Sequence, residues 1–197
     1  MNTRIRIYMT GVGGQGTLTA TTLLARVALA QGLEVVAGEV HGMAQRGGVV
    51  ESVVLLGGWQ SPKLGHGEAD ILLGFEPLET LRGLPYLTQG GVVFSSEDPL
   101  PPLGVSLGRE QYPTAEAIRA SVRAVAGQAH FLPCRQLGIR AGAVQSGNTA
   151  LLGALAASGV LPFGLEALEA GIRTWLPAKV QEVNCVAARL GADALGR

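Results

Sequence analysis

The chain has 197 residues, of which 47% are hydrophobic and 15% charged, and its fifteen basic residues balance its fifteen acidic ones. This length can bury a sizeable core without disulfides or metals, and the absence of a basic run argues against a nucleic-acid partner. An ordinary soluble domain carries about 25% charged residues, so we expect another chain to cover part of an apolar surface. A monomer rich in alanine, leucine and glycine with a large core is the alternative.

Targeting and metal-binding features are missing from the sequence. The first residues run straight into a strand pattern without a signal-peptide core, and the longest apolar stretch, near residues 150–160, is too short to span a membrane. Cys134 and Cys185 lie far apart and form no CxxC pair, which fits a reducing compartment and rules out a cluster or structural zinc held by cysteines of this chain. We therefore expect a cytoplasmic protein with no membrane segment and no metal of its own.

The first part of the chain predicts a strand, a helix and two more strands. Residues 4–9 alternate charged and apolar side chains, residues 17–31 repeat apolar side chains at spacings of three and four, and residues 33–38 form a short apolar run. Only a short segment that includes residues 41–47 separates this run from the next predicted strand, 48–56, and so few residues cannot form a crossover helix. The two strands are therefore either antiparallel neighbours or separated by a functional loop.

The rest of the chain predicts more strands and then helices alone. We expect a central strand at 69–75, a short helix at 77–82, a turn at 89–91 leading into a strand at 92–95, a helix at 114–127 capped by Thr114, and a strand at 129–133. Further helices are expected from Ser146 or Asn148 to 158, at 163–175 and at 177–188. The predicted fold is a single α/β domain, residues 1–197, with three layers (α/β/α). A mixed, mostly parallel sheet occupies about 1–134 and a C-terminal helical segment about 135–197.

A glycine-rich turn joins the first strand to the first helix. Gly11, Gly13 and Gly16 of Gly11-Val12-Gly13-Gly14-Gln15-Gly16 follow the pattern G-x-G-x-x-G. Such a turn lets the backbone approach a ligand, and the free N–H groups of the helix N-terminus favour an anion. Glu39 lies just past the second predicted strand, near the place where an acidic residue holds a ribose hydroxyl. By itself this pattern predicts a dinucleotide site, with a tight packing turn as the alternative.

Two observations argue against a complete dehydrogenase. The second crossover helix is missing, and no set of side chains supplies hydride chemistry. Of the three histidines, only His41 lies in a motif-like segment, whereas His66 is expected in an exposed loop and His130 in a structural position.

The glycine turn and a second segment together resemble a known family. With Glu39-Val40-His41-Gly42-Met43-Ala44-Gln45-Arg46-Gly47-Gly48, the turn resembles the gamma-type subunits of the 2-oxoacid:ferredoxin oxidoreductases, most closely the small (beta) subunit of the indolepyruvate type. The likeness continues through residues 69–79 and 148–154 and ends in 179–184. Residues 99–108 resemble nothing in the family.

The resemblance implies the oxidative decarboxylation of a 2-oxoacid, indolepyruvate or another aryl pyruvate, with coenzyme A to an acyl-CoA, CO2 and reduced ferredoxin. It implies that a larger partner subunit carries thiamine diphosphate, magnesium and the iron–sulfur clusters, and that this chain is inactive alone. The chain would bind no cofactor by itself, and coenzyme A would bind at a shared site. A homodimer is left open for the isolated chain. The alternative function is a free-standing Rossmann-like module that binds a nucleotide or coenzyme A.

The predicted site has two parts and contains no assigned catalytic residue or metal ligand. The cofactor-binding part comprises Gly11, Gly13, Gly14, Gln15 and Gly16. The loop for substrate, coenzyme A or subunit contact comprises Glu39, His41, Gly42, Gln45, Arg46, Gly47 and Gly48. Arg46 could bind a carboxylate or phosphate bidentately, with an intersubunit salt bridge as the alternative. Gln45 and His41 could donate hydrogen bonds to a ligand or only shape the loop, and Glu39 is expected to anchor it.

Five further positions have simpler interpretations. Glu76 and Glu79 flank Pro77 in the first turn of a helix, where acidic side chains favour the dipole, so a structural role is expected. Asn148 is expected to cap its helix. Trp59 and Trp175 are candidate interface anchors, although the helical spacing of Trp175 also fits a core position.

Overall fold

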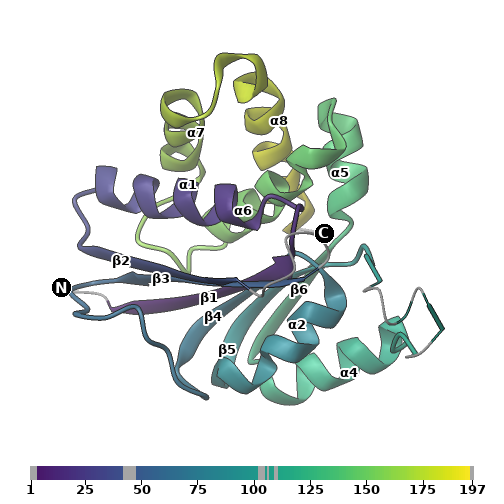
Figure 1. The fold of residues 1–197 in the computed structure, drawn as a ribbon. Helices are drawn as coiled ribbons and strands as arrows, with labels where there is room; N and C mark the ends of the chain where they lie inside the picture. The colour runs from purple at the N-terminus through teal and green to yellow at the C-terminus, as the bar shows by residue number, and fades with distance from the viewer. Residues whose placement is uncertain (1–3, 42–47, 102–104, 106, 109–110, 196–197) are drawn as a thin grey trace.

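The computed structural model describes residues 4–41, 48–101, 105, 107–108 and 111–195. Its six strands, β1 (Ile5–Val12), β2 (Val35–His41), β3 (Val49–Leu56), β4 (Ala69–Gly74), β5 (Leu87–Ser96) and β6 (Gln128–Leu132), form one sheet in the order β2-β3-β1-β4-β5-β6 (Figure 1). Strands β1, β4, β5 and β6 are parallel, and β3 runs antiparallel to both β1 and β2. The mixed, mostly parallel sheet is confirmed, and β2 and β3 are antiparallel neighbours.

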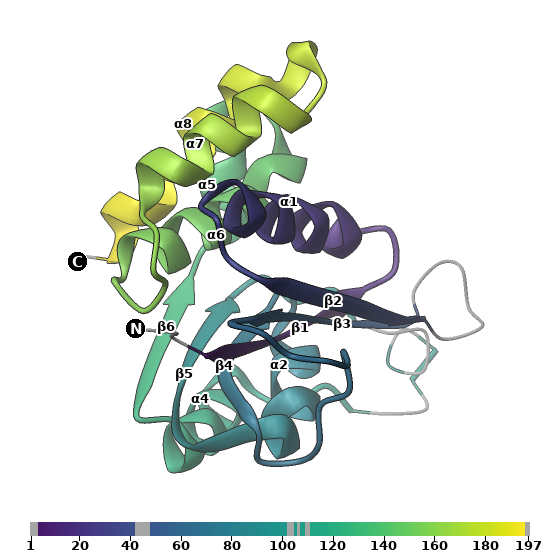
Figure 2. The same cartoon turned by 90° about the vertical axis from the view of Figure 1, so that its left-hand side faces the viewer.

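Helices cover both faces of the sheet. The helices are α1 (Thr17–Ala30), α2 (Pro77–Gly83), α4 (Ala115–Val125), α5 (Cys134–Ala141), α6 (Gly147–Ala157), α7 (Leu165–Trp175) and α8 (Ala178–Leu195), with 3₁₀ turns η1 (Leu84–Tyr86) and η2 (Val144–Ser146). Figures 1 and 2 show α1 and α5 to α8 on one face and α2 and α4 on the other. The three-layer α/β/α prediction is therefore confirmed. Within the part of the chain that the structure describes, no helix is both long and apolar enough to cross a membrane.

The helices begin where the sequence supplies caps or strong packing. Thr114 caps α4 by accepting a hydrogen bond from the backbone N–H of Ala117 at 3.2 Å, and Ile118 and Val122 bury one face of this helix. Helix α6 is buried on almost every side, because it lies between the sheet and α8. Such a helix is apolar all round, and its packing rather than a cap stabilises it.

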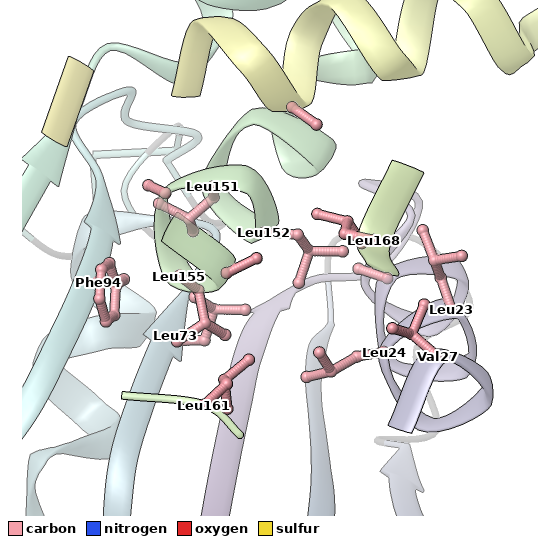
Figure 3. Close-up of a cluster of buried hydrophobic side chains, with 14 of the residues drawn as sticks. Leu23, Leu24, Val27, Leu73, Phe94, Leu151, Leu152, Leu155, Leu161 and Leu168 are labelled. Atoms are coloured by element: carbon pink, nitrogen blue, oxygen red, sulfur yellow. The ribbon is translucent and has the colours of Figure 1, made fainter. Parts of the chain in front are cut away.

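The main core lies between the sheet and the helices α1, α6 and α7. Figure 3 shows side chains of α1, α6 and the sheet pointing toward one another, and its labelled residues are Leu23, Leu24, Val27, Leu73, Phe94, Leu151, Leu152, Leu155, Leu161 and Leu168. Each large apolar side chain buried here contributes about 1.5–3 kcal/mol. A smaller core that includes Tyr8, Leu72 and Val122 lies between the other face of the sheet and α4.

Several element boundaries differ from the sequence-based prediction. Strand β1 continues through Gly11 and Val12, because these residues pair with Val50 and Val49 of β3. Strand β2 extends to His41, so Glu39 lies within the strand and not past it. Strand β5 begins at Leu87, so residues 89–91 are strand and not turn. For β1 and β2, pairing with β3 supplies hydrogen bonds that the local pattern does not indicate, whereas residues 89–91 lie where the register between β4 and β5 shifts.

Helix α5 and the last helix also differ from the prediction. The eight residues of α5 were not predicted as a helix, because so short a segment shows little periodicity. Its Gly138 packs against the following turn, where an added Cβ would lie 2.6 Å from the carbonyl oxygen of Val144. Helix α8 continues to Leu195 and is longer than predicted, since its second half packs against α6.

The two tryptophans are only partly buried. The indole N–H of Trp59 donates to the carbonyl oxygen of Leu56 at 2.9 Å, and the guanidinium groups of Arg4 and Arg6 lie 4.9 and 5.3 Å from its rings. Trp175 packs partly against the main core. Their role as interface anchors stays a prediction.

Candidate functional site

The glycine turn lies at the carboxyl end of β1. Gly14 and Gly16 adopt positive φ angles of 94° and 86°, which a side chain would strain, and Gly16 is the residue immediately before α1. Gly16 provides no side-chain cap, and the first turn of α1 has no acidic residue. The cap position therefore leaves the first N–H groups of α1 available for another partner.

Hydrogen bonds from three segments hold this turn. The side-chain oxygen of Gln15 accepts from the backbone N–H of Val12 at 2.8 Å, and the N–H of Gly13 donates to the carbonyl oxygen of Gly48 at 2.7 Å. The side-chain amide of Asn148 donates to the carbonyl oxygen of Gln15 at 2.5 Å. The N–H groups of Val12 and Gly13 are thus occupied within the chain, and α1 provides the remaining donors nearby.

Asn148 does not cap its helix, contrary to the sequence-based interpretation. Helix α6 begins at Gly147, and its first residues offer no side-chain cap. Ser146 uses its hydroxyl to donate to the carbonyl oxygen of Ala143 at 2.7 Å. Because the glycine turn lies next to α6, the side chain of Asn148 reaches the turn instead. Asn148 is therefore a site residue that the local sequence pattern assigned to the wrong role.

A hydrogen bond between two polar side chains, Thr149 and Asn184, joins α6 to α8. Thr149 donates to the side-chain oxygen of Asn184 at 2.6 Å, and the side-chain N–H of Asn184 donates to the carbonyl oxygen of Val180 at 2.7 Å. Neither residue was singled out from local pattern. Both lie in the segments 148–154 and 179–184 that resembled the family, and that resemblance is the one signal that could have found them.

Two cavities flank the glycine turn and share Gly14, Gln15, Gln145 and Asn148. The larger one, of about 400 Å³, lies between α1, α6 and α8, and none of its lining residues is charged. Amides, hydroxyls and apolar side chains such as Leu23, Leu176 and Val183 line it. A ligand part that fits this cavity should therefore be uncharged and able to form hydrogen bonds with amides.

The smaller cavity, of about 220 Å³, lies at the carboxyl edge of the parallel strands. It is lined by Gln15 after β1, Phe75 after β4, Ser96 at the end of β5 and Cys134 after β6. The helices that follow β1 and β4 lie on opposite faces of the sheet (Figure 1). A crevice where neighbouring strands send their helices to opposite faces is the usual ligand site of open α/β sheets.

Two groups in the smaller cavity, Asp98 and Cys134, are held by hydrogen bonds or by burial. Asp98 accepts from the backbone N–H of Arg135 at 2.7 Å and from the hydroxyl of Ser96 at 3.2 Å. Burial raises the pKa of the Cys134 thiol to about 12, so this cysteine is not a thiolate nucleophile near neutral pH. The described residues hold no group of three or more His, Cys, Asp or Glu side chains that could bind a metal ion.

Glu39 lies too far from the glycine turn for the dinucleotide interpretation. It pairs in register with Ser52 on β3, and β3 separates β2 from β1. Two strand spacings amount to roughly 10 Å, whereas the acidic residue of a dinucleotide site lies on the strand next to the glycine turn. The inserted β3 thus removes the geometry that the spacing of Gly16 and Glu39 suggested.

The described ends of the second predicted part lie beside the glycine turn. The backbone of His41 ends β2, and the carbonyl of Gly48 contacts Gly13 in the glycine turn. Gly42, Gln45, Arg46 and Gly47 lie outside the described residues. The residues that flank the segment 42–47 therefore lie at the same end of the sheet as the glycine turn, the end at which β1 finishes.

Glu76 has a structural role, as expected. It is fully buried, and its carboxylate accepts from the backbone N–H groups of Glu79 and Leu100 at 2.9 and 3.1 Å and from the hydroxyl of Tyr112. It thus caps α2 and ties the segment after β5 to it. Glu79 is also buried and pairs with Arg82 at 2.8 Å. Burial raises the pKa of Glu79, and the guanidinium of Arg82 opposes this shift only in part.

The family model described as pyruvate ferredoxin/flavodoxin oxidoreductase matches residues 6–194. The chain belongs to this family. Indolepyruvate oxidoreductase subunit IorB of Pyrococcus horikoshii is 42% identical over 193 residues, covering 95% of this chain and 94% of that protein. The subunit of the same name from Thermococcus kodakarensis is 40% identical with the same coverage. The resemblance drawn from the two glycine-containing segments is confirmed, and a free-standing Rossmann-like module is not supported.

Solved structures share the fold of this family member. The gamma subunit of the keto/oxoacid ferredoxin oxidoreductase from Geobacter sulfurreducens has a TM-score of 0.69 and 22% identity, covering 97% of this chain and 98% of that chain. The 2-oxoglutarate:ferredoxin oxidoreductase of Magnetococcus marinus, solved with 2-oxoglutarate, coenzyme A and succinyl-CoA bound, has a TM-score of 0.70 and 17% identity. The match covers 100% of this chain and only 32% of the Magnetococcus marinus chain. The solved structures share the fold, and the family model and the relatives of 40–42% identity make this chain a subunit of a 2-oxoacid:ferredoxin oxidoreductase.

Proposed function

We propose that the chain is the small subunit of an indolepyruvate-type 2-oxoacid:ferredoxin oxidoreductase, and that its glycine turn forms one wall of a coenzyme A site shared with the larger subunit. Four relatives, 34–42% identical over 95% of the chain, are indolepyruvate oxidoreductase subunits. This similarity favours indolepyruvate or another aryl pyruvate as the substrate. The Magnetococcus marinus enzyme with coenzyme A bound contains the same fold.

The observation that carries the coenzyme A proposal is the pair of cavities on either side of the glycine turn. Coenzyme A joins an uncharged arm with two amides to a phosphate-bearing nucleotide. The larger cavity suits the arm, because amides and apolar groups line it without any charge. The N-terminus of α1 suits an anionic group, because its first N–H groups face the same turn. The predicted loop with Arg46 would add a guanidinium for a phosphate or the oxoacid carboxylate.

In this proposal the chemistry of the reaction belongs to the larger subunit. The larger subunit would hold thiamine diphosphate, magnesium and the iron–sulfur clusters, and the assembled complex would pass electrons to ferredoxin. The complex would work in the cytoplasm, and the isolated small subunit could pair with itself. This chain's own part is to bind coenzyme A, to orient it and to complete the walls of the site.

Co-expression with the larger subunit tests the proposal. We expect the isolated chain to be colourless and inactive. The complex should reduce ferredoxin or a dye with aryl pyruvates, in a reaction that depends on coenzyme A, and more efficiently than with pyruvate or 2-oxoglutarate. Oxidoreductase activity of the isolated chain, or a complex without activity on any 2-oxoacid, would contradict the proposal.

A charge placed in the larger cavity tests the coenzyme A site directly. Thr19 is exposed, lies in the first turn of α1 and lines this cavity, so Thr19→Glu should fold normally and repel a phosphate bound at the N-terminus of α1. We expect the KM for coenzyme A to rise about tenfold, with the KM for the 2-oxoacid unchanged. Thr174→Glu is the matched control, because Thr174 is exposed on α7 outside this cavity. Equal KM values for the two variants would argue against coenzyme A at this site.

A further inference from the structure

Strand β6 is an open edge of the sheet. Strand β6 pairs with β5 on one side, and none of the described residues pairs with it on the other side. Figure 2 shows β6 at the margin of the sheet, with α4 on one side and the C-terminal end of α8 on the other. An open edge presents unpaired backbone groups that can bind another strand. Its sequence, Gln-Ala-His-Phe-Leu, contains no proline and no lysine, the residues that commonly block such an edge.

The outward backbone groups of β6 follow from one hydrogen bond. The carbonyl oxygen of Leu132 accepts from the N–H of Glu97, which continues β5, so the backbone polar groups of Leu132 face β5. Because the N–H and C=O of a strand residue point to one side and alternate along the strand, His130 also faces β5. The N–H and C=O groups of Ala129 and Phe131 therefore point away from the sheet.

A cavity of about 240 Å³ straddles this edge. It is lined on one side by Arg119 and Arg123 of α4 and on the other by Ala194 and Leu195 at the end of α8, with residues 129–132 of β6 between them. His130 stacks on Phe94 in the main core, whereas Phe131 packs against the smaller core, so the cavity reaches both faces of β6. An occupant would thus meet the backbone edge and both flanking helices.

The charges along this edge favour an acidic occupant. Arg119 and Arg123 lie four residues apart on one face of α4. Arg119 pairs with Glu97 and lies 5.3 Å from the ring of Phe131. Arg123 is exposed and forms no ion pair with any residue that the structure describes. Burial lowers the pKa of His130, which leaves this histidine neutral near pH 7. The cavity therefore contains one guanidinium without a carboxylate partner.

We propose that an extended acidic segment of the larger subunit docks along β6 and adds a seventh strand to the sheet. Its backbone would pair with the outward groups of Ala129 and Phe131, and a carboxylate would bind Arg123. Because strand side chains alternate between faces, acidic residues would point toward α4 and apolar residues toward Ala194 and Leu195 of α8. This inference rests on the larger subunit that the proposed function requires.

A second copy of this chain fits the edge poorly. Pairing of β6 with β6 would bring the two arginines of each copy together, which the like charges oppose. Pairing of β6 with the other open edge, β2, would be head-to-tail, and such contacts extend into filaments unless they close into a ring. An acidic segment of a different chain avoids both problems.

Hydrogen exchange of the free chain and of the assembled complex tests the proposal. We expect the Ala129 and Phe131 amides to exchange at least about tenfold more slowly in the complex than in the free chain. Arg123→Glu should raise the Kd for the larger subunit by about tenfold. Arg140→Glu is the matched control, since Arg140 is exposed on α5 and does not line this cavity, and it should change the Kd less than about twofold.

The outcomes separate this inference from the proposed function. A complex that forms without slowing the Ala129 and Phe131 amides overturns strand addition and leaves the proposed function standing. A complex with both amides slowed but without oxidoreductase activity supports strand addition and contradicts the function. Failure to form any complex overturns both. Protection of the free chain that grows with its concentration would identify a second copy as the occupant, and equal effects of Arg123→Glu and Arg140→Glu would exclude an acidic one.

Discussion

Replacing Gly11 with alanine should destabilise the fold, although Gly11 lies in a regular strand. Its φ angle is not positive, so alanine can adopt the same backbone. A Cβ at this position would lie 2.7 Å from the hydroxyl oxygen of Thr17, 3.2 Å from the Cβ of Phe75 and 3.3 Å from the side-chain oxygen of Gln15. Contacts this short require neighbours to move, and overpacking of this kind costs about 1–3 kcal/mol.

The net effect is smaller than the packing cost. Removing a glycine stiffens the unfolded chain and contributes about 0.4–1 kcal/mol to stability, so we expect Gly11→Ala to lower the free energy of unfolding by about 1–2 kcal/mol. Urea unfolding followed by circular dichroism measures this change, and an unchanged m value would show that the unfolding reaction is the same. In a chain of this size, each kcal/mol lowers Tm by about 2–4 °C.

A second substitution identifies the clash. Thr17 is buried and its hydroxyl has no hydrogen-bond partner, so Thr17→Ala removes the nearest obstructing atom without breaking a hydrogen bond. We expect Gly11→Ala combined with Thr17→Ala to be more stable than the sum of the single effects by about 1 kcal/mol. Additive single effects, or a neutral Gly11→Ala variant, would refute the assignment of this glycine to close packing.

Three further predictions concern the site and its supports. Asn148→Ala should lower the free energy of unfolding by about 1 kcal/mol, because the carbonyl of Gln15 loses its donor, and Asn148→Asp, which cannot donate there when ionised, should lower it more. Gly191→Ala should cost about 3 kcal/mol, because a Cβ there would overlap the carbonyl oxygen of Ala150 and force α6 and α8 apart. Because burial raises the pKa of Glu79 above 4.5, the folded carboxyl keeps its proton at pH values where the unfolded one loses it. Wild-type stability should therefore fall relative to Glu79→Gln as the pH rises from 4.5 through the raised folded pKa, and stay level above it.

Thermal and urea unfolding check these three predictions. Equal stability of Asn148→Ala and the wild type would mean that the turn keeps its shape without this hydrogen bond. A wild-type Tm for Gly191→Ala would mean that α6 and α8 can separate at no cost. A stability difference between Glu79→Gln and the wild type that does not vary with pH would show that the folded pKa of Glu79 is not raised.

Local patterns in the sequence were sufficient for most elements and for the family. The glycine turn lies between a strand and a helix as predicted, and α4 begins after its Thr114 cap. The short segment between β2 and β3 excluded a crossover helix on length alone, and the structure shows the antiparallel pair. These predictions succeeded because turn residues, caps and connection lengths act within a few residues of the chain.

The tertiary structure alone decided where the site residues meet. Asn148 contacts the glycine turn across 133 residues of sequence, so no local pattern could distinguish this role from a helix cap. The placement of β3 between β1 and β2 moved Glu39 away from the turn, since strand order depends on hydrogen bonds between distant segments. The open edge of β6 and the cavities beside the glycine turn likewise depend on how distant segments pair and pack. The sequence by itself therefore determined the elements and the family, whereas long-range pairing and packing decided which of their residues lie together.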